Sequence, residues 1–313
     1  DPHDPIRKMC IPAVSETDRG GTFDTSGEAG NTVYEGIQHK YHETALILTT
    51  NRCATYCRHC FRKRLVGQSD DEIAHHFGNV VDYIREHKEI SNVILSGGDA
   101  LMLPTRTISR YIEAFVDMEH LDLIRIATRM PVVLPMRILE DVELLSALDS
   151  LCRRKQLYIV TQFNHPRELT KTAKEALRAL LKCGLIIKNQ TVLLKGVNDD
   201  PKILGELLKG LTASGVVPYY IFQCRPVTGV MHSFQVPLSV GYEIVEEAKA
   251  MQNGQGKCLK YCMSHPKGKI EIIGKADDDK MIFKYHQAKY DEDAGRIFIR
   301  NITENETWLP DDI

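Results

Sequence analysis

Short apolar runs alternate with longer amphipathic segments through the middle of the chain. Six runs predict buried strands, at residues 45–49, 92–96, 123–127, 157–162, 186–193 and 217–222. The segments between and after them have the apolar spacing of helices, at residues 70–87, 105–117, 139–152, 170–183, 201–214 and 239–252. Strands that alternate with helices in this way are typical of a parallel sheet. The chain is therefore predicted to have an α/β fold.

The same pattern divides the chain into three parts. Residues 1–43 are polar and contain several glycines, which predicts an extended N-terminal arm. Residues 44–252 hold the six strand–helix units. Because a closed eight-unit barrel typically needs about 250 residues, we expect an incomplete parallel (β/α)6 barrel here. Residues 253–313 have short alternating runs at 269–273, 281–285 and 296–299, which predict a small C-terminal β extension.

Composition narrows the class of protein. At 313 residues and 43% hydrophobic content, the chain can bury a barrel-sized core. A net charge of −2 argues against a general binder of nucleic acids or membrane surfaces, and no apolar run approaches the length of a membrane span. Nine cysteines, three of them clustered and others isolated, suit a reducing compartment rather than a disulfide framework. We therefore expect a cytoplasmic protein.

The clustered cysteines carry the strongest chemical signal. Cys53, Cys57 and Cys60 form a C-x3-C-x2-C motif directly after the first predicted strand. Three thiolates can bind three irons of a [4Fe–4S] cluster and leave the fourth iron open, whereas an electron-transfer cluster has four cysteines. A structural zinc site with His59 or a remote cysteine as fourth ligand is an alternative, but such sites usually pair two Cys-x2–4-Cys knuckles, and one is present here. Three buried cysteines without a special role are the other alternative.

Further polar residues follow the predicted strands, at the ends where catalytic groups collect in parallel α/β folds. Residues 96–99 (SGGD) come directly after the second strand. Glycines let a backbone approach a ligand closely, and the acid can accept hydrogen bonds, although a tight turn explains the same letters. Arg129, His165 and Gln190 lie at later strands, where ligand contact and a structural role in the barrel interior are both open.

The cysteine spacing resembles that of the radical S-adenosylmethionine (SAM) superfamily, in which SAM binds the open iron. Longer strings resemble lysine 2,3-aminomutase and its relatives. They are HKY at 39–41, CRHC at 57–60, LSGGDAL at 95–101, PVVLP at 131–135, FNHP at 163–166, NQTVLLKGVND at 189–199 and PYYIFQC at 218–224. Because these strings follow the family's order over most of the chain, the chain is identified as a divergent member of that family.

The resemblance implies roles for particular residues. It makes Cys53, Cys57 and Cys60 the cluster ligands, and Ser96, Gly97, Gly98, Asp99 and Gln190 the SAM contacts. Arg62 matches the arginine that binds the substrate carboxylate, a task that suits the bidentate guanidinium group. Lys40 stands where relatives have an arginine that helps to bind the phosphate of pyridoxal phosphate (PLP), and a lysine meets a phosphate as a point charge.

Two departures from the family pattern bear on cofactor and substrate. The stretch that normally carries the PLP lysine reads SHPKGKIEI at residues 264–272, without the family's run of glycines. Lys269 is the candidate Schiff-base lysine there and Lys267 the alternative. Arg225 stands where the lysine enzymes have an aspartate that reads the distal ammonium group, so an acidic or neutral substrate side chain is implied. Contact between Arg225 and the PLP phosphate is the alternative. Cys258 and Cys262 are interpreted as ordinary thiols.

The function implied is that of a radical SAM enzyme, in which a reduced [4Fe–4S] cluster cleaves SAM to a 5′-deoxyadenosyl radical. With PLP it would be a 2,3-aminomutase, an isomerase, acting on an amino acid other than lysine. The alternative is a PLP-independent enzyme of the same family, such as an epimerase or dehydrogenase. A non-catalytic iron–sulfur or zinc protein is a more remote one. The resemblance also implies a reductant such as flavodoxin or ferredoxin and favours a homo-oligomer.

Overall fold

The computed structural model describes residue 1 and residues 3–313. One twelve-stranded sheet, ordered β1 to β12, contains every strand of the described chain. The strands are β1 (Thr32–Tyr34), β2 (Ile37–Tyr41), β3 (Thr44–Thr50), β4 (Asn92–Gly97), β5 (Leu123–Ala127), β6 (Gln156–Thr161), β7 (Ile186–Leu193), β8 (Val217–Gln223), β9 (Lys260–His265), β10 (Gly268–Asp277), β11 (Lys280–Ala288) and β12 (Ile297–Asn301). Strands β3 to β9 are parallel, whereas β1, β2 and β10 to β12 pair antiparallel with their neighbours.

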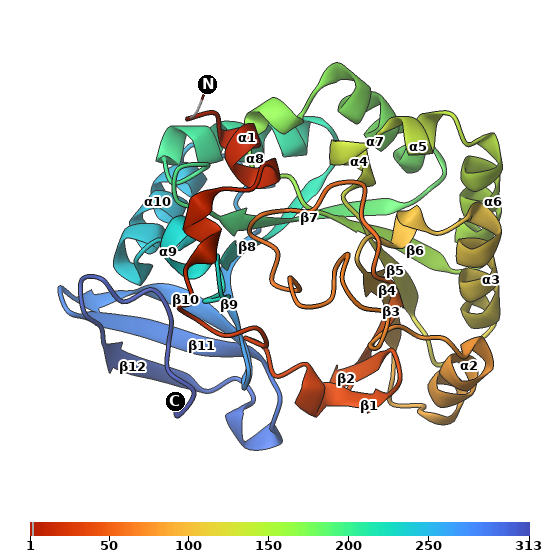
Figure 1. Cartoon of the computed structure of the whole chain (residues 1–313), viewed down its shortest axis with the longest axis horizontal. Helices are drawn as coiled ribbons and strands as arrows, with labels where there is room; N and C mark the ends of the chain where they lie inside the picture. Colours follow the sequence, from red (N-terminus) through yellow and green to blue (C-terminus); the bar gives the residue numbers. More distant parts are fainter. Residues whose placement is uncertain (2) are drawn as a thin grey trace.

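The sheet curves around an interior, and the helices lie along its outer side (Figure 1). The α-helices are α1 (Pro5–Cys10), α2 (Phe77–Glu86), α3 (Thr105–Val116), α4 (Met130–Val133), α5 (Met136–Leu139), α6 (Val142–Cys152), α7 (Lys171–Lys182), α8 (Pro201–Ala213), α9 (Met231–Phe234) and α10 (Leu238–Ala250). None of the described helices is long and apolar enough to cross a membrane.

Alternation along the parallel strands decides which side chains face the interior. In β5, Ile124 and Ile126 are fully buried in the main core, whereas Arg125 and Ala127 face a cavity on the other side. Because successive side chains of a strand point to opposite faces, each strand can pack against helices and still supply polar groups to the interior. The polar side chains that could bind ligands therefore face the interior of the curved sheet.

The α/β fold predicted from the sequence is confirmed, and each predicted strand of the middle region matches one of β3 to β8 within two residues. Three features differ from the expectations. Strand β9 was not predicted; it pairs parallel with β8 and makes the C-terminal strands a continuation of the same sheet. The arm contains β1 and β2, and the helix expected at 70–87 begins only at Phe77.

The N-terminal arm packs against the loops that follow β3 and β8. Thr22 forms an isolated bridge with Val227, and the Met9 carbonyl accepts a hydrogen bond of 2.8 Å from the backbone N–H of Arg58. The arm thus contacts the loop that follows β3, which carries the clustered cysteines (Figure 1).

Candidate active site

A cavity of about 400 Å³ lies within the curve of the sheet. The residues singled out by the sequence that line it are Lys40, Cys53, Cys57, His59, Cys60, Arg62, Ser96, Gly97, Gly98, Asp99, Arg129, Gln190, Arg225 and Lys269. They come from seven different strands or strand-end loops between β2 and β10. The structure therefore brings residues separated by more than 200 positions to one site. Lys267 and His165 are not among the lining residues.

The cysteine loop is held in place by the arm. Glu16 accepts hydrogen bonds from Arg58 Nε at 2.8 Å and from Lys63 Nζ at 2.6 Å. Burial raises the pKa of Glu16, but the hydrogen bonds from Arg58 and Lys63 more than offset this and hold it at about 2. One carboxylate thus fixes both ends of the segment that contains Cys60.

The cysteine thiols are free and face the cavity together. Among the described residues, no three His, Cys, Asp or Glu side chains converge on a point where one metal ion could bind. A [4Fe–4S] cluster makes a different demand, because each of its cysteines binds a different iron. The donor set of three thiols on one loop, with polar donors directed at two of the sulfurs, fits such a cluster.

The close approach of the cysteine loop requires glycines at the end of β4, where Gly97 is the last residue of the strand and Gly98 follows it. Gly97 has φ +122°, and a Cβ there would lie 2.2 Å from the Thr50 carbonyl oxygen. A Cβ on Gly98 would lie 2.4 Å from the Arg52 carbonyl oxygen. The two loops are also joined by backbone hydrogen bonds, including Asp99 N–H to Arg52 C=O at 2.8 Å. The Gly-Gly pair therefore lets the end of β4 lie directly against the start of the cysteine loop.

The Asp99 carboxylate is already satisfied by the protein. Its Oδ1 accepts hydrogen bonds from the Thr128 hydroxyl at 2.6 Å and the Leu101 N–H at 3.0 Å, and its Oδ2 accepts one from the Arg129 N–H at 2.7 Å. Asp99 therefore ties the ends of β4 and β5 together. Ser96, Gly97 and Gly98 line the cavity beside it.

Arg62 is engaged by a buried carboxylate that the sequence analysis did not single out. Glu28, 4% exposed, accepts from Arg62 Nε at 2.9 Å and from Arg64 Nη2 at 2.7 Å. Arg62 Nη1 also donates to Ser96 Oγ at 3.2 Å. Burial raises the pKa of Glu28, yet the charge of Arg62 and these hydrogen bonds lower it to about 2. A substrate carboxylate that reaches Arg62 has to share it with Glu28.

The two candidate PLP lysines point in different directions. Lys267 donates to the C-terminal carbonyl of Ile313, away from the cavity. Lys269 faces the cavity, where its Nζ donates to Gln287 Oε1 at 2.7 Å and lies 4.4 Å from the centre of the Tyr220 ring. Burial lowers the pKa of Lys269 to about 8, with Arg125 and Arg225 adding repulsion. Lys269 therefore has a substantial neutral amine fraction near neutral pH.

Lys40 and Arg225 stand beside Lys269. Lys40 Nζ donates to the His265 carbonyl at 2.6 Å, and burial, followed by the charges of Arg225, Lys289 and Lys269, lowers its pKa to about 7. Arg225 donates through Nη2 to Ser264 Oγ at 2.8 Å, and its Nη1 is buried with no hydrogen-bond partner among the described residues.

Positive charge is in excess around the cavity. The lining cations are Lys40, Arg62, Arg125, Arg129, Arg225 and Lys269, whereas Glu28 and Asp99 are the acids among the described lining residues. Both acids are already hydrogen-bonded to protein groups. The cavity is therefore suited to anionic groups, and the cations crowded around Lys269 fit the phosphate of PLP.

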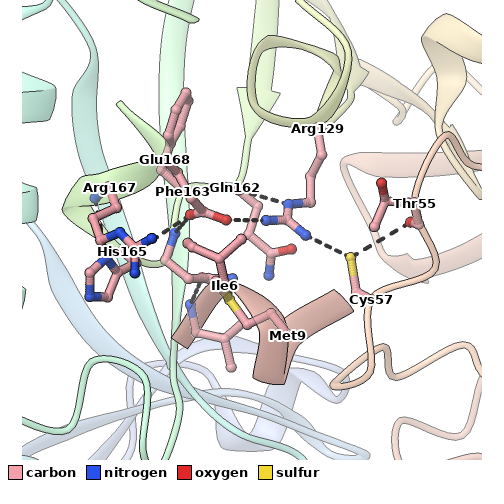
Figure 2. A network of polar contacts seen from close by, with 12 residues as sticks. Ile6, Met9, Thr55, Cys57, Arg129, Gln162, Phe163, His165, Arg167 and Glu168 are labelled. Atoms are coloured by element: carbon pink, nitrogen blue, oxygen red, sulfur yellow. Dashed lines mark hydrogen bonds and ion pairs between the residues drawn. The ribbon is translucent and has the colours of Figure 1, made fainter. Parts of the chain in front are cut away.

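For Arg129 the sequence left both ligand contact and a structural role open. Its side chain makes several hydrogen bonds. Figure 2 shows its guanidinium between Cys57 and Glu168. Nη1 donates to Cys57 Sγ at 2.7 Å, Nη2 to Glu168 Oε1 at 2.6 Å, and Nε to the Gln162 carbonyl at 2.9 Å. Its position after a predicted strand was a usable signal, but its partners lie at sequence separations that no local pattern reveals.

Comparison with known proteins points to one family. Residues 47–207 match the family model of the Radical SAM superfamily. The chain is 40% identical to a putative L-lysine 2,3-aminomutase of Aquifex aeolicus, over 99% of this chain and 83% of that protein. It is 37% identical to L-lysine 2,3-aminomutase of Clostridium subterminale, over 81% of this chain and 60% of the relative. It is 36% identical to glutamate 2,3-aminomutase of Clostridioides difficile, over 85% of this chain and 62% of the relative.

Proposed function

The chain belongs to the radical SAM superfamily and, within it, to the lysine 2,3-aminomutase family, and from this premise we propose that it is a PLP-dependent 2,3-aminomutase for an amino acid other than lysine. The proposed substrate has an acidic or neutral side chain. Within the α/β fold, we propose that β3 to β8 and their helices form the six-unit partial barrel typical of this superfamily.

The proposed substrate class rests on the burial and hydrogen bonding of Arg225. Its guanidinium is buried at the cavity wall, one donor nitrogen lacks a partner, and no unpaired acid lines the cavity among the described residues. Burial lowers the pKa of Arg225 to about 10, so the group stays protonated at neutral pH. A cationic substrate side chain would meet repulsion there, whereas a carboxylate would supply the missing acceptor.

The cluster and SAM are assigned to the part of the cavity that is lined by the cysteine loop and the end of β4. Cys53, Cys57 and Cys60 would hold the cluster, and Gln190 with the loop 96–99 would contact SAM. Bound together, the two supply radical chemistry that removes a hydrogen atom from an unactivated carbon. The protein's own part is to fix the cysteine loop through Glu16.

PLP is assigned to Lys269 and Lys40. Lys269 has the depressed pKa that a nucleophilic amine needs. Lys40 would donate a hydrogen bond to the phosphate, whose negative charge would favour the protonated form of this lysine. When bound, PLP supplies the conjugated system through which an amino group can move between C2 and C3. Arg62 would orient the substrate by its α-carboxylate, with Glu28 fixing the guanidinium in place.

The test uses anaerobic protein loaded with iron, sulfide, SAM and PLP, and reduced with dithionite. Glutamate, alanine and lysine are supplied separately, and β-amino acids are measured by mass spectrometry. We expect the acidic or neutral substrate to react, with lysine well behind. Preferential conversion of lysine would overturn the substrate class. SAM cleavage that proceeds without PLP, with no β-amino acid from any substrate, would favour the PLP-independent alternative.

Lysine variants provide matched controls for the PLP assignment. Lys269→Ala should abolish covalent attachment of PLP, detected as a borohydride-fixed mass increase, and β-amino acid formation with it. Lys267→Ala should retain both, because Lys267 points away from the cavity. Loss of attachment in Lys267→Ala but not in Lys269→Ala would reverse the assignment.

A further inference from the structure

Arg129 is held in a single orientation by contacts on three sides. Its backbone N–H binds Asp99, its Nε binds the Gln162 carbonyl, and its Nη2 binds Glu168. Glu168 is fixed in turn, because its Oε2 accepts the backbone N–H groups of Asn164 at 2.6 Å and His165 at 3.1 Å. These contacts leave the guanidinium with Nη1 directed at Cys57 Sγ, 2.7 Å away (Figure 2).

A purely structural ion pair does not require this arrangement. Arg58 and Arg167 also pair with carboxylates, Glu16 and Asp4, and neither has a hydrogen bond to a cysteine sulfur. The Arg129–Glu168 pair is also well shielded, with side-chain exposures of 11% and 6%. Because solvent screening is weak there, the charge of Arg129 acts strongly on the adjacent sulfur.

We propose that Arg129 is a positioning residue that orients Cys57 and raises the reduction potential of the cluster. Hydrogen bonds to ligand sulfur and nearby positive charge stabilise the more negative, reduced cluster relative to the oxidised one. Glu168 holds Arg129 in place and at the same time offsets part of its charge. The inference rests on the proposed cluster at Cys53, Cys57 and Cys60, but not on PLP or the substrate.

The test is the midpoint potential of the cluster, measured by redox titration with electron paramagnetic resonance detection, without SAM or substrate. Removing the cation in Arg129→Gln should lower the equilibrium constant for one-electron reduction at least tenfold, which is about 59 mV more negative. Glu168→Gln should shift the potential in the opposite direction, since it removes a negative charge and keeps Arg129. Arg167→Gln, which removes an exposed arginine paired with Asp4, should leave the potential unchanged.

Iron content per chain is measured in parallel. If Arg129→Gln does not bind a cluster, the potentials of Arg129→Lys and Glu168→Gln are compared with that of wild type instead. Arg129→Lys keeps the positive charge, so the equilibrium constant for one-electron reduction should change less than tenfold. Equal potentials in wild type, Arg129→Gln and Glu168→Gln would overturn the inference and leave Arg129 with a structural role. The titration is repeated with SAM bound. A shift in potential that appears only in this second titration would also overturn the inference, since Arg129 would then act on SAM rather than on Cys57.

The outcomes separate this inference from the proposed function. Wild-type protein that binds no iron after reconstitution would refute the cluster, and with it both claims. Shifted potentials in a protein that makes no β-amino acid would support the role of Arg129 and refute the aminomutase. β-Amino acid formation with unshifted potentials would do the reverse.

Discussion

Arg225→Gln tests the substrate class at the residue on which it depends. Two unit charges 4 Å apart interact by about 4 kcal/mol at an effective dielectric constant of 20. Because a substrate carboxylate loses hydration when it binds, we expect only part of this energy to survive. The expected loss in kcat/KM for glutamate is therefore about 100-fold, or about 2.7 kcal/mol. Alanine has no distal charge and should be affected far less.

The assay compares initial rates of β-amino acid formation from glutamate and alanine in wild type, Arg225→Gln and Arg225→Lys. The lysine variant keeps the charge and should lose less than the glutamine variant. Arg154→Gln removes an exposed arginine paired with Asp117 and should match wild type. Equal losses for glutamate and alanine in Arg225→Gln would refute the reasoning, because Arg225 would then support the site without reading the side chain.

Three further predictions follow from the loops and lysines around the cavity. Gly97→Ala should lower the free energy of unfolding by at least about 1–3 kcal/mol, because φ is +122° and the Cβ would overlap the Thr50 carbonyl. Gly78→Ala, in α2 with nothing within 4 Å of its Cβ, should instead raise it, and denaturant titration compares the two. Glu16→Gln should lower the iron bound per chain by releasing Arg58 and Lys63; iron content equal to wild type would show that these contacts do not hold the loop. The rate of PLP attachment should rise about fivefold from pH 7 to pH 8 and level off above pH 9, because the lowered pKa of Lys269, about 8, makes the neutral amine available there. A rate that still rises about sevenfold from pH 9 to pH 10 would indicate an ordinary lysine.

The sequence was a good guide where the signal is local. The six middle strands have apolar runs long enough to be recognised, and the cysteine spacing predicts a cluster-binding loop within eight residues. Strand β9 (KYCMSH) has no such run; it becomes a strand because β8 and β10 pair with it on either side. Its contribution to the sheet is a property of the tertiary structure, and the local pattern could not reveal it.

The site was predictable in its residue types but not in its partners. Glu28 lies in a polar arm, and nothing near it indicates that it meets Arg62, 34 positions away. Asp99 was predicted as a ligand contact, but its hydrogen bond from Thr128, which joins the ends of β4 and β5, was not foreseen. Arg129 looked like one of several polar residues after a strand. In each case a contact between segments that are distant in sequence determines the role of the residue. Tertiary packing sets such contacts, and the local spacing of residues along the chain does not.

Tracing the hydrogen removed from the substrate tests the proposed radical aminomutase reaction most directly. Glutamate labelled with deuterium at C3 is supplied to the loaded, reduced enzyme, and both 5′-deoxyadenosine and the amino-acid product are analysed by mass spectrometry. A radical 2,3-aminomutase for an acidic substrate predicts deuterium in 5′-deoxyadenosine and a β-amino acid in which deuterium has been transferred from C3 to C2. If 5′-deoxyadenosine forms without deuterium and no β-amino acid appears, the account is contradicted.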